Sequence, residues 1–159
     1  MTRVVFVTPN QGRQAEVQRL LADVEIELSR LGPVAPAELD FEAAARARSS
    51  AAFAELGRPC FVENTAFELE GEGELRGAAL KRLLAAHGEA GFCRAYGGRR
   101  ATAKVAVALC DSAGESAAVH AFVGGIDGEV AREPRGHEGW GWDRVFVPEG
   151  YARTLGELL

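Results

Sequence analysis

The sequence predicts a single α/β domain whose sheet contains both parallel and antiparallel strands. Short apolar, β-branched runs alternate with helical segments in the first half of the chain. In the second half, two long alternating segments are joined by a polar turn, which is typical of a β-hairpin. The 159 residues suit one domain with a sizeable core, and no repeat or linker divides them.

The N-terminal half is predicted to alternate between strand and helix. The run "RVVFV" is short, apolar and β-branched, as in a buried strand, and Asn10 is a suitable N-cap for the helix that follows. Gly57 stands before Arg58-Pro59 as a good C-cap for an Ala-rich helix. The predicted elements are a strand at 3–7, a helix at 11–22, a strand at 24–28 and a helix at 37–57.

The C-terminal half is predicted from the same local signals. The segment "CFVENTAFELE" suggests two short strands flanking Asn64 and Thr65, and "GEGE" a turn. The final "LGELL" could begin a helix. The other predicted elements are helices at 77–87 and 89–96, hairpin strands at 101–110 and 117–130, a loop at 132–141 and a strand at 142–147.

Composition excludes several classes of function. A net charge of −5 argues against a broad nucleic-acid surface, and no apolar stretch is long enough for a membrane span. The three cysteines form no C-x-x-C pair, so a zinc site or a disulfide framework is not expected. Reduced, buried thiols and the absence of a signal-peptide pattern predict a cytoplasmic location.

The turn after the first strand, "VTPNQGRQAE", is a candidate phosphate site. It contains neither the Walker phosphate loop nor the three spaced glycines of a dinucleotide fingerprint. A hydroxyl from Thr8, an amide from Asn10 and backbone N–H groups at a helix N-terminus can bind an anion, and Arg13 can add a bidentate contact. An ordinary strand–turn–helix with Asn10 as a cap and Arg13 in solvent remains the alternative.

A longer segment near the C-terminus resembles a known enzyme family. The run "EPRGHEGWGWDRVFVPEGYARTLGEL" is similar to the glycine-rich G-F-G-[YW]-D-P-x-F-x-P-x-G segment, followed by T-x-x-E, of the inosine and xanthosine triphosphate pyrophosphatases. The matching residues are Gly139, Trp140, Gly141, Trp142, Asp143, Phe146, Pro148, Gly150, Thr154 and Glu157.

Three other segments resemble the same family in the right order. Thr8, Asn10, Arg13 and Glu16 fall on its T-x-N-x-x-K-x-x-E pattern, with Arg in place of Lys. "RPCFVENTAF" resembles its P-V-x-x-[ED]-D-[ST]-G-L segment, and "LRGAALKRLL" the loop-to-helix step that follows. Together the four segments cover nearly all of the chain.

The resemblance implies a fold, an activity and a site. The fold would be inosine-triphosphatase-like: an elongated mixed sheet flanked by helices, with two lobes and a central cleft. The activity would be Mg²⁺-dependent hydrolysis of purine nucleoside triphosphates such as ITP and XTP to monophosphate and pyrophosphate, by a homodimer. The implied substrate-binding residues are Thr8, Asn10, Arg13, Lys81, Trp140, Trp142 and Asp143. The implied metal ligands are Glu38 and Glu63, and the implied catalytic positions are Glu63 and Asn64.

Three departures from the family pattern bear on chemistry. Arg13 replaces a lysine, so a planar guanidinium group stands in place of a compact ammonium group. Asn64 replaces the catalytic Asp, and an amide cannot accept a proton at neutral pH and is a poor Mg²⁺ ligand. The base-contacting S-H-R motif does not occur before Leu159. Glu63 could substitute as base, although its side chain should point away from that of Asn64 on an extended segment.

Two classes of function are therefore compatible with the sequence. The first is a pyrophosphatase whose activity is weakened at position 64. The second is a catalytically inactive relative that binds a nucleotide or a partner protein. Several implied site residues also have structural interpretations: Trp140 and Trp142 as core, and Lys81 and Glu63 as solvated side chains.

Overall fold

The computed structural model describes residues 3–32, 35–36, 39–112 and 118–159. The hydrogen-bonded order of strands is β2-β1-β3-β5-β6-β7, and β4 pairs with β3. Strand β1 pairs in parallel with both β2 and β3. Strand β4 pairs antiparallel with β3, and β7 pairs antiparallel with β6. The predicted mixed sheet flanked by helices is confirmed. The chain divides into two compact units, one of residues 1–64 and 106–123 and one of residues 65–105 and 124–159.

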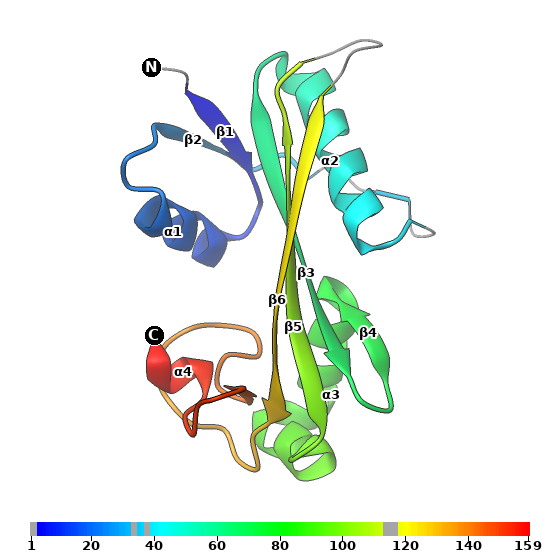
Figure 1. Cartoon of the computed structure of the whole chain (residues 1–159), viewed down its shortest axis with the longest axis vertical. Coiled ribbons are helices and arrows are strands. Elements are labelled where there is room, and N and C mark those ends of the chain that lie inside the picture. Colours follow the sequence, from blue (N-terminus) through cyan, green and yellow to red (C-terminus); the bar gives the residue numbers. More distant parts are fainter. Residues whose placement is uncertain (1–2, 33–34, 37–38, 113–117) are drawn as a thin grey trace. The chain divides into compact units, whose positions relative to one another are not determined.

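The first unit is built on a parallel β1-α1-β2 crossover (Figure 1). Strand β1 lies between β2 and β3, with Val5 opposite Cys60. Its Val5, Phe6 and Val7 are fully buried, as in a parallel strand whose two faces are both covered. Phe6 of β1 stacks on Phe61 of β3 with ring centroids 4.6 Å apart. The elements that begin in this unit are β1 (Val4–Val7), α1 (Gln11–Leu20), β2 (Ile26–Ser29), α2 (Phe41–Leu56), β3 (Cys60–Leu69) and β6 (Val119–Val130).

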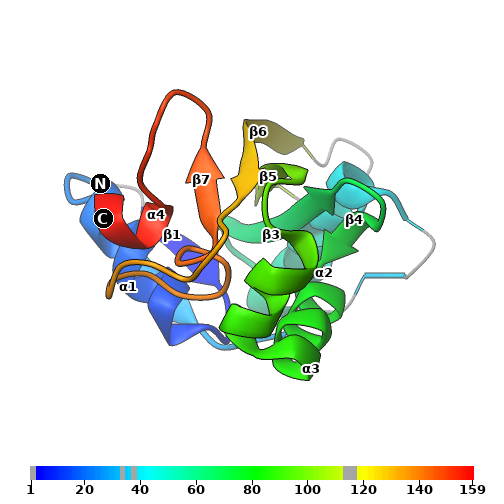
Figure 2. The same ribbon diagram turned by 90° about the horizontal axis from the view of Figure 1, so that it is seen from below.

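The second unit holds a separate hydrophobic cluster. Phe67 of β3 is fully buried and meets Phe146 edge to face at 5.5 Å, while Leu80 and Phe92 of α3 pack into the same cluster. Helix α3 lies beside β4, and α4 beside β7 (Figure 2). The elements that begin in this unit are β4 (Gly73–Arg76), α3 (Gly77–Tyr96), β5 (Arg100–Cys110), β7 (Phe146–Pro148) and α4 (Leu155–Leu158).

Several predicted elements are confirmed together with their end signals. Asn10 caps α1, and Gly57 ends α2 in the left-handed conformation with φ 67°. Gly88, with φ 66° and ψ 160°, separates the two predicted helices inside α3. Strands β5 and β6 are neighbours, as the hairpin prediction requires.

Other predictions were wrong. The two short strands around Asn64 are one continuous strand, β3, and part of the predicted 71–74 turn belongs to β4. The strand predicted at 142–147 is reduced to β7, because residues 140–145 turn: Asp143 N–H donates to the Trp140 carbonyl, and Val145 N–H to that of Trp142.

Among the described residues, no helix is long and apolar enough to cross a membrane.

Candidate active site

The turn after β1 is held by its own side chains. Thr8 Oγ1 accepts a hydrogen bond from the Asn10 N–H at 3.2 Å. Asn10 Oδ1 accepts from the Gly12 and Arg13 N–H groups at 2.9 and 3.3 Å, so it satisfies two donors of the first helical turn. Gln14, a buried residue that sequence reasoning did not select, donates from Nε2 to the Thr8 carbonyl at 3.0 Å. The turn is therefore fixed before any ligand arrives.

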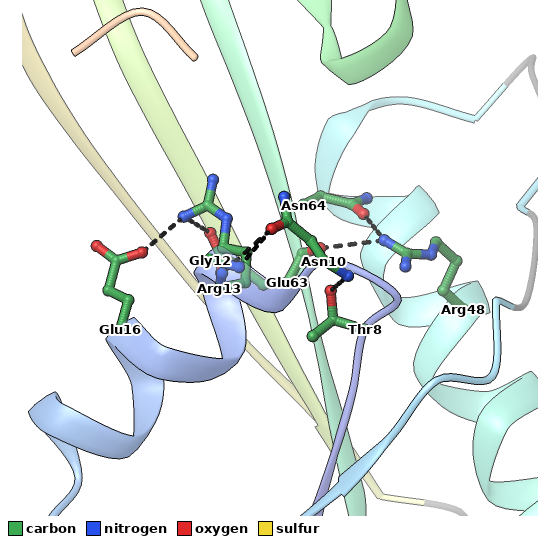
Figure 3. Close-up of polar contacts among 8 residues, drawn as sticks. All are labelled: Thr8, Asn10, Gly12, Arg13, Glu16, Arg48, Glu63 and Asn64. Carbon is green, nitrogen blue, oxygen red and sulfur yellow. Dashed lines mark hydrogen bonds and ion pairs between the residues drawn. The ribbon is translucent and has the colours of Figure 1, made fainter. Parts of the chain in front are cut away.

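Strand β3 carries Glu63 and Asn64 on opposite faces, as the alternation of an extended strand predicts. Glu63 faces α1, where its Oε1 lies 2.6 Å from Arg13 Nη1 (Figure 3). Asn64 faces α2, where its Oδ1 accepts a short hydrogen bond from Arg48. The first unit thus brings Thr8, Asn10, Arg13, Glu63 and Asn64 into one region.

Glu63 is the most perturbed carboxyl group of this region. Its side chain is only 9% exposed, and burial raises its pKa to about 7. Glu16 raises the pKa further, while the charges of Arg13 and Arg48 oppose these effects. Glu63 Oε1 is buried, and its partner among the described residues is the guanidinium of Arg13, with which it forms an ion pair at 2.6 Å. A carboxyl group with a pKa near neutrality is suited to accept and release a proton at physiological pH.

Arg48 is a functional candidate that the sequence reasoning missed. Its Nη1 donates to the Glu63 carbonyl at 3.1 Å as well as to Asn64, and burial lowers its pKa while Glu63 opposes that shift. The spacing of residues along the predicted helix could have indicated that Arg48 is buried. Arg48 is four residues, about one helical turn, from both Ala44 and Ala52, which are buried. A basic residue in an apolar stripe of a helix indicates a partner or a ligand.

The amide of Asn64 is used by the fold. Besides accepting from Arg48, it donates from Nδ2 to the carbonyl of Phe41, the first residue of α2, at 3.4 Å. A carboxylate could not make that second bond. Asn64 therefore ties β3 to α2 and fixes the guanidinium of Arg48.

Of the remaining predicted site residues, one is not described by the structure and four belong to the second unit. Glu38 lies outside the described residues. Lys81 is an exposed residue of α3 in the second unit. In the same unit, Asp143 Oδ2 accepts from the Trp140 N–H at 2.7 Å, and the rings of Trp140 and Trp142 lie 6.1 Å apart. Trp142 also contacts Phe67 at 5.6 Å, so it is at least partly a core residue, as its structural interpretation predicted.

Comparison with known proteins settles the family. The model of the Ham1 family matches residues 4–159. The chain belongs to the Ham1 family. A protein of Pyrobaculum aerophilum named dITP/XTP pyrophosphatase is 33% identical over 161 residues, covering 98% of this chain and 84% of the relative. The inosine triphosphate pyrophosphatase of Yarrowia lipolytica is 33% identical over 159 residues, covering 98% and 83%.

Solved structures support the fold of this Ham1-family chain. A HAM1 protein from Coxiella burnetii superposes with a TM-score of 0.74 at 23% identity, covering 99% of this chain and 87% of the other. A nucleoside-triphosphatase, or dITP/XTP pyrophosphatase, from Mycobacterium abscessus gives a TM-score of 0.70 at 22% identity, covering 99% and 89%. The family resemblance inferred from four sequence segments is confirmed.

Proposed function

We propose that this chain is a nucleoside-triphosphate pyrophosphatase that hydrolyses deaminated purine nucleotides such as dITP, ITP and XTP to the monophosphate and pyrophosphate. The names of its relatives support the reaction class. The observation that carries the proposal in this chain is Glu63, a buried carboxyl group with a pKa of about 7 on β3, between two arginines. Such a group can take the proton of an attacking water.

Mg²⁺ is the proposed cofactor, because a triphosphate needs charge neutralisation and Mg²⁺ is usually held by one or two carboxylates plus substrate phosphates. The described residues contain no group of three or more His, Cys, Asp or Glu placed to hold a metal. Glu63 is proposed as one protein ligand through its second carboxyl oxygen, because Oε1 lies 2.6 Å from Arg13 Nη1. Glu38 is the second proposed ligand. When bound, the ion would polarise the phosphate oxygens.

The arginines supply the charge that the reaction requires. Arg13 and Arg48 would neutralise the negative charge that grows on the leaving pyrophosphate. Asn64 cannot act as a base, so we assign it the positioning of Arg48 and assign proton acceptance to Glu63. Thr8 and Asn10 would shape the phosphate-binding turn, and Lys81 would add a cation. Trp140 and Trp142 would stack on the base, and Asp143 would accept hydrogen bonds from base or sugar.

The test of the proposed function is a pyrophosphate-release assay with Mg²⁺ over a panel of substrates. We expect turnover of dITP and XTP, with kcat/KM well above that for ATP and dGTP. An inactive, nucleotide-binding relative would show a rise in melting temperature with these nucleotides and no pyrophosphate. No thermal shift and no turnover with any nucleotide at millimolar concentration would rule out both.

Asn64→Asp should raise the rate of pyrophosphate release about tenfold or more, toward the 10²–10⁴-fold contribution of a well-positioned proton acceptor. The substitution exchanges an NH₂ for an oxygen at nearly constant volume and returns a second carboxylate and a hard oxygen ligand to the site. The measurement is kcat with dITP for both proteins. An unchanged or lower kcat would show that the amide, with its bonds to Arg48 and Phe41, is the group that the reaction needs at this position.

We also propose that the protein is a homodimer that works in the cytoplasm. Phe122 and Val123 of β6 are 66% and 53% exposed, and they precede the Gly128–Val130 segment of that strand that pairs with β7. Exposed apolar side chains along a strand favour association. The cysteines of the described residues are free and buried, in keeping with a reducing compartment. Light scattering should give twice the chain mass of 16.9 kDa.

A further inference from the structure

One residue of α4 holds both flanks of the tryptophan segment (residues 139–142), which carries the two tryptophans of the chain. The carbonyl of Gly156 accepts hydrogen bonds from the His137 and Glu138 N–H groups, just before the segment, at 3.2 and 3.3 Å. The N–H of Gly156 donates to the carbonyl of Asp143, just after the segment, at 2.7 Å. A single residue from a later part of the chain therefore fixes both ends of the tryptophan segment.

The absence of a side chain at two positions makes this close approach possible. A Cβ on Gly156 would lie 3.0 Å from the Arg135 carbonyl oxygen and 3.1 Å from that of Glu138. A Cβ on Gly136, where φ is 89°, would lie 2.1 Å from the carbonyl carbon of Gly156. Glycine at both positions lets the backbone of α4 lie against the loop that precedes β7 (Figure 1, Figure 2).

The neighbours of Gly156 in α4 are tied to the same loop by their side chains. Thr154 is fully buried, and its hydroxyl donates to the Arg135 carbonyl at 2.8 Å. Glu157 Oε2 accepts from the Thr154 N–H at 2.8 Å, as in a capping box, and lies 3.3 Å from Arg135 Nε. These contacts fix the start of α4, and with it the place of Gly156.

The hold on Asp143 reaches the first tryptophan through a side chain. Asp143 Oδ2 accepts a hydrogen bond from the Trp140 N–H at 2.7 Å. Trp142 is supported by the second unit's core, because its ring lies 5.6 Å from that of Phe67. A shift of Asp143 would therefore move Trp140 relative to Trp142.

We propose that Gly156, anchored by Thr154 and Glu157, is a positioning residue that fixes the tryptophan segment and so sets selectivity for the purine base. This role rests on the proposed function, in which the two tryptophans stack on the base, and deepens it. Stacking alone tolerates any purine, because every base has a π-face. Discrimination between a 6-oxo and a 6-amino group requires polar groups at fixed places beside the ring, and a firmly held segment provides them.

The test compares Thr154→Val with Thr154→Ser in steady-state hydrolysis of dITP and dATP. Valine keeps the shape of threonine and removes the hydroxyl that bonds the Arg135 carbonyl, whereas serine keeps that hydroxyl. We expect Thr154→Val to lower the ratio of kcat/KM for dITP to kcat/KM for dATP about tenfold, mainly through a higher KM for dITP, because tenfold corresponds to about one hydrogen bond. Thr154→Ser should keep the wild-type ratio.

Tryptophan fluorescence reports on the segment directly, because both tryptophans of the chain lie in it. In the free protein, Thr154→Val should make the emission more accessible to quenching by acrylamide, whereas Thr154→Ser should match the wild type. Gly156→Ala places a Cβ against two carbonyl oxygens of the loop and should give the same change by a second route. Circular dichroism shows whether each variant is folded.

Thr102→Val is the matched control. Thr102 lies on β5 in the same unit, and its hydroxyl donates to Asp127 Oδ1 at 2.6 Å. The substitution removes a threonine hydroxyl away from the tryptophan segment. Acrylamide quenching and base selectivity should therefore both equal those of the wild type.

Several results from the variants would overturn the proposal. One is a folded Thr154→Val protein with wild-type quenching and wild-type selectivity. Another is a Thr154→Ser protein that loses as much as Thr154→Val, or equal losses of kcat/KM for dITP and dATP that leave their ratio unchanged. Loss of the folded state in both Thr154→Val and Gly156→Ala would overturn it too, because it would show a role in global stability.

Results with the wild type separate this role from the proposed function. If dITP is hydrolysed but leaves the tryptophan emission unchanged, the proposed activity stands and this role falls. If dITP binds without release of pyrophosphate, the activity falls, and the ratio of dissociation constants for dITP and dATP tests this role in its place. If dITP neither binds nor is hydrolysed, both fall.

Discussion

Glu63→Gln is expected to lower kcat for pyrophosphate release by about 10²–10⁴-fold, the usual contribution of a positioned general base. Glutamine keeps the volume and the capacity to accept a hydrogen bond, but it cannot take a proton at neutral pH. Because Glu63 is buried with a pKa of about 7, it is half ionised near neutrality, where a base is both available and strong enough to act. The measurement is steady-state kinetics with dITP and Mg²⁺.

A matched control lies on the same strand. Glu68 of β3 is 52% exposed and ion-paired with Lys104, so Glu68→Gln makes the same chemical change away from the cluster around Glu63. We expect its kcat to equal that of the wild type. If Glu63→Gln had the same kcat as Glu68→Gln and the wild type, proton acceptance would have to be assigned to another group.

The burial of Glu63 should also make folding stability depend on pH. In the unfolded chain its carboxyl group ionises near 4.5, whereas in the folded protein it keeps its proton up to about pH 7. The folded state therefore binds more protons in this window, and the free energy of unfolding falls as pH rises through it. The stabilising contribution is fully present below about pH 4.5 and is lost above about pH 7.

The pH dependence can be isolated by comparing wild type with Glu63→Gln. A rise in the pKa of Glu63 from 4.5 to about 7 on folding should cost the wild type, relative to the variant, about 2–3 kcal/mol of stability between pH 5 and pH 8. Any constant effect of the substitution on packing cancels in this difference. Urea unfolding at the two pH values provides the measurement, and parallel pH dependences of the two proteins would show that Glu63 titrates like an exposed carboxyl group.

Much of the first unit could be predicted because its signals are local. The apolar run before Thr8 forms β1, Asn10 caps α1 through its own neighbours, and Gly57 ends α2 with a backbone conformation that glycine favours. The opposite directions of Glu63 and Asn64 follow from the two-residue period of a strand. Each of these features depends on residues only a few positions apart.

Features that depend on distant residues could not be predicted in the same way. The partner of Arg13 is Glu63, fifty positions along the chain, and nothing in the local pattern of α1 indicates that pair. Arg48 joins the site only because α2 packs beside β3. The apolar segment at 142–147 has strand-forming residues, but Asp143 binds the Trp140 N–H and turns the backbone before β7 begins. In these places tertiary contacts override local preference.

Product analysis of dITP hydrolysis by the wild-type protein tests the central claim most directly. With Mg²⁺ present, chromatography of the nucleotides and a parallel pyrophosphate assay should show one dIMP formed for each pyrophosphate, with no dIDP and no orthophosphate at early times. Glu63→Gln, assayed at the same protein concentration, should form neither product at a comparable rate. Release of dIDP and orthophosphate, or full conversion by Glu63→Gln, would contradict a pyrophosphatase that depends on the carboxyl group of Glu63.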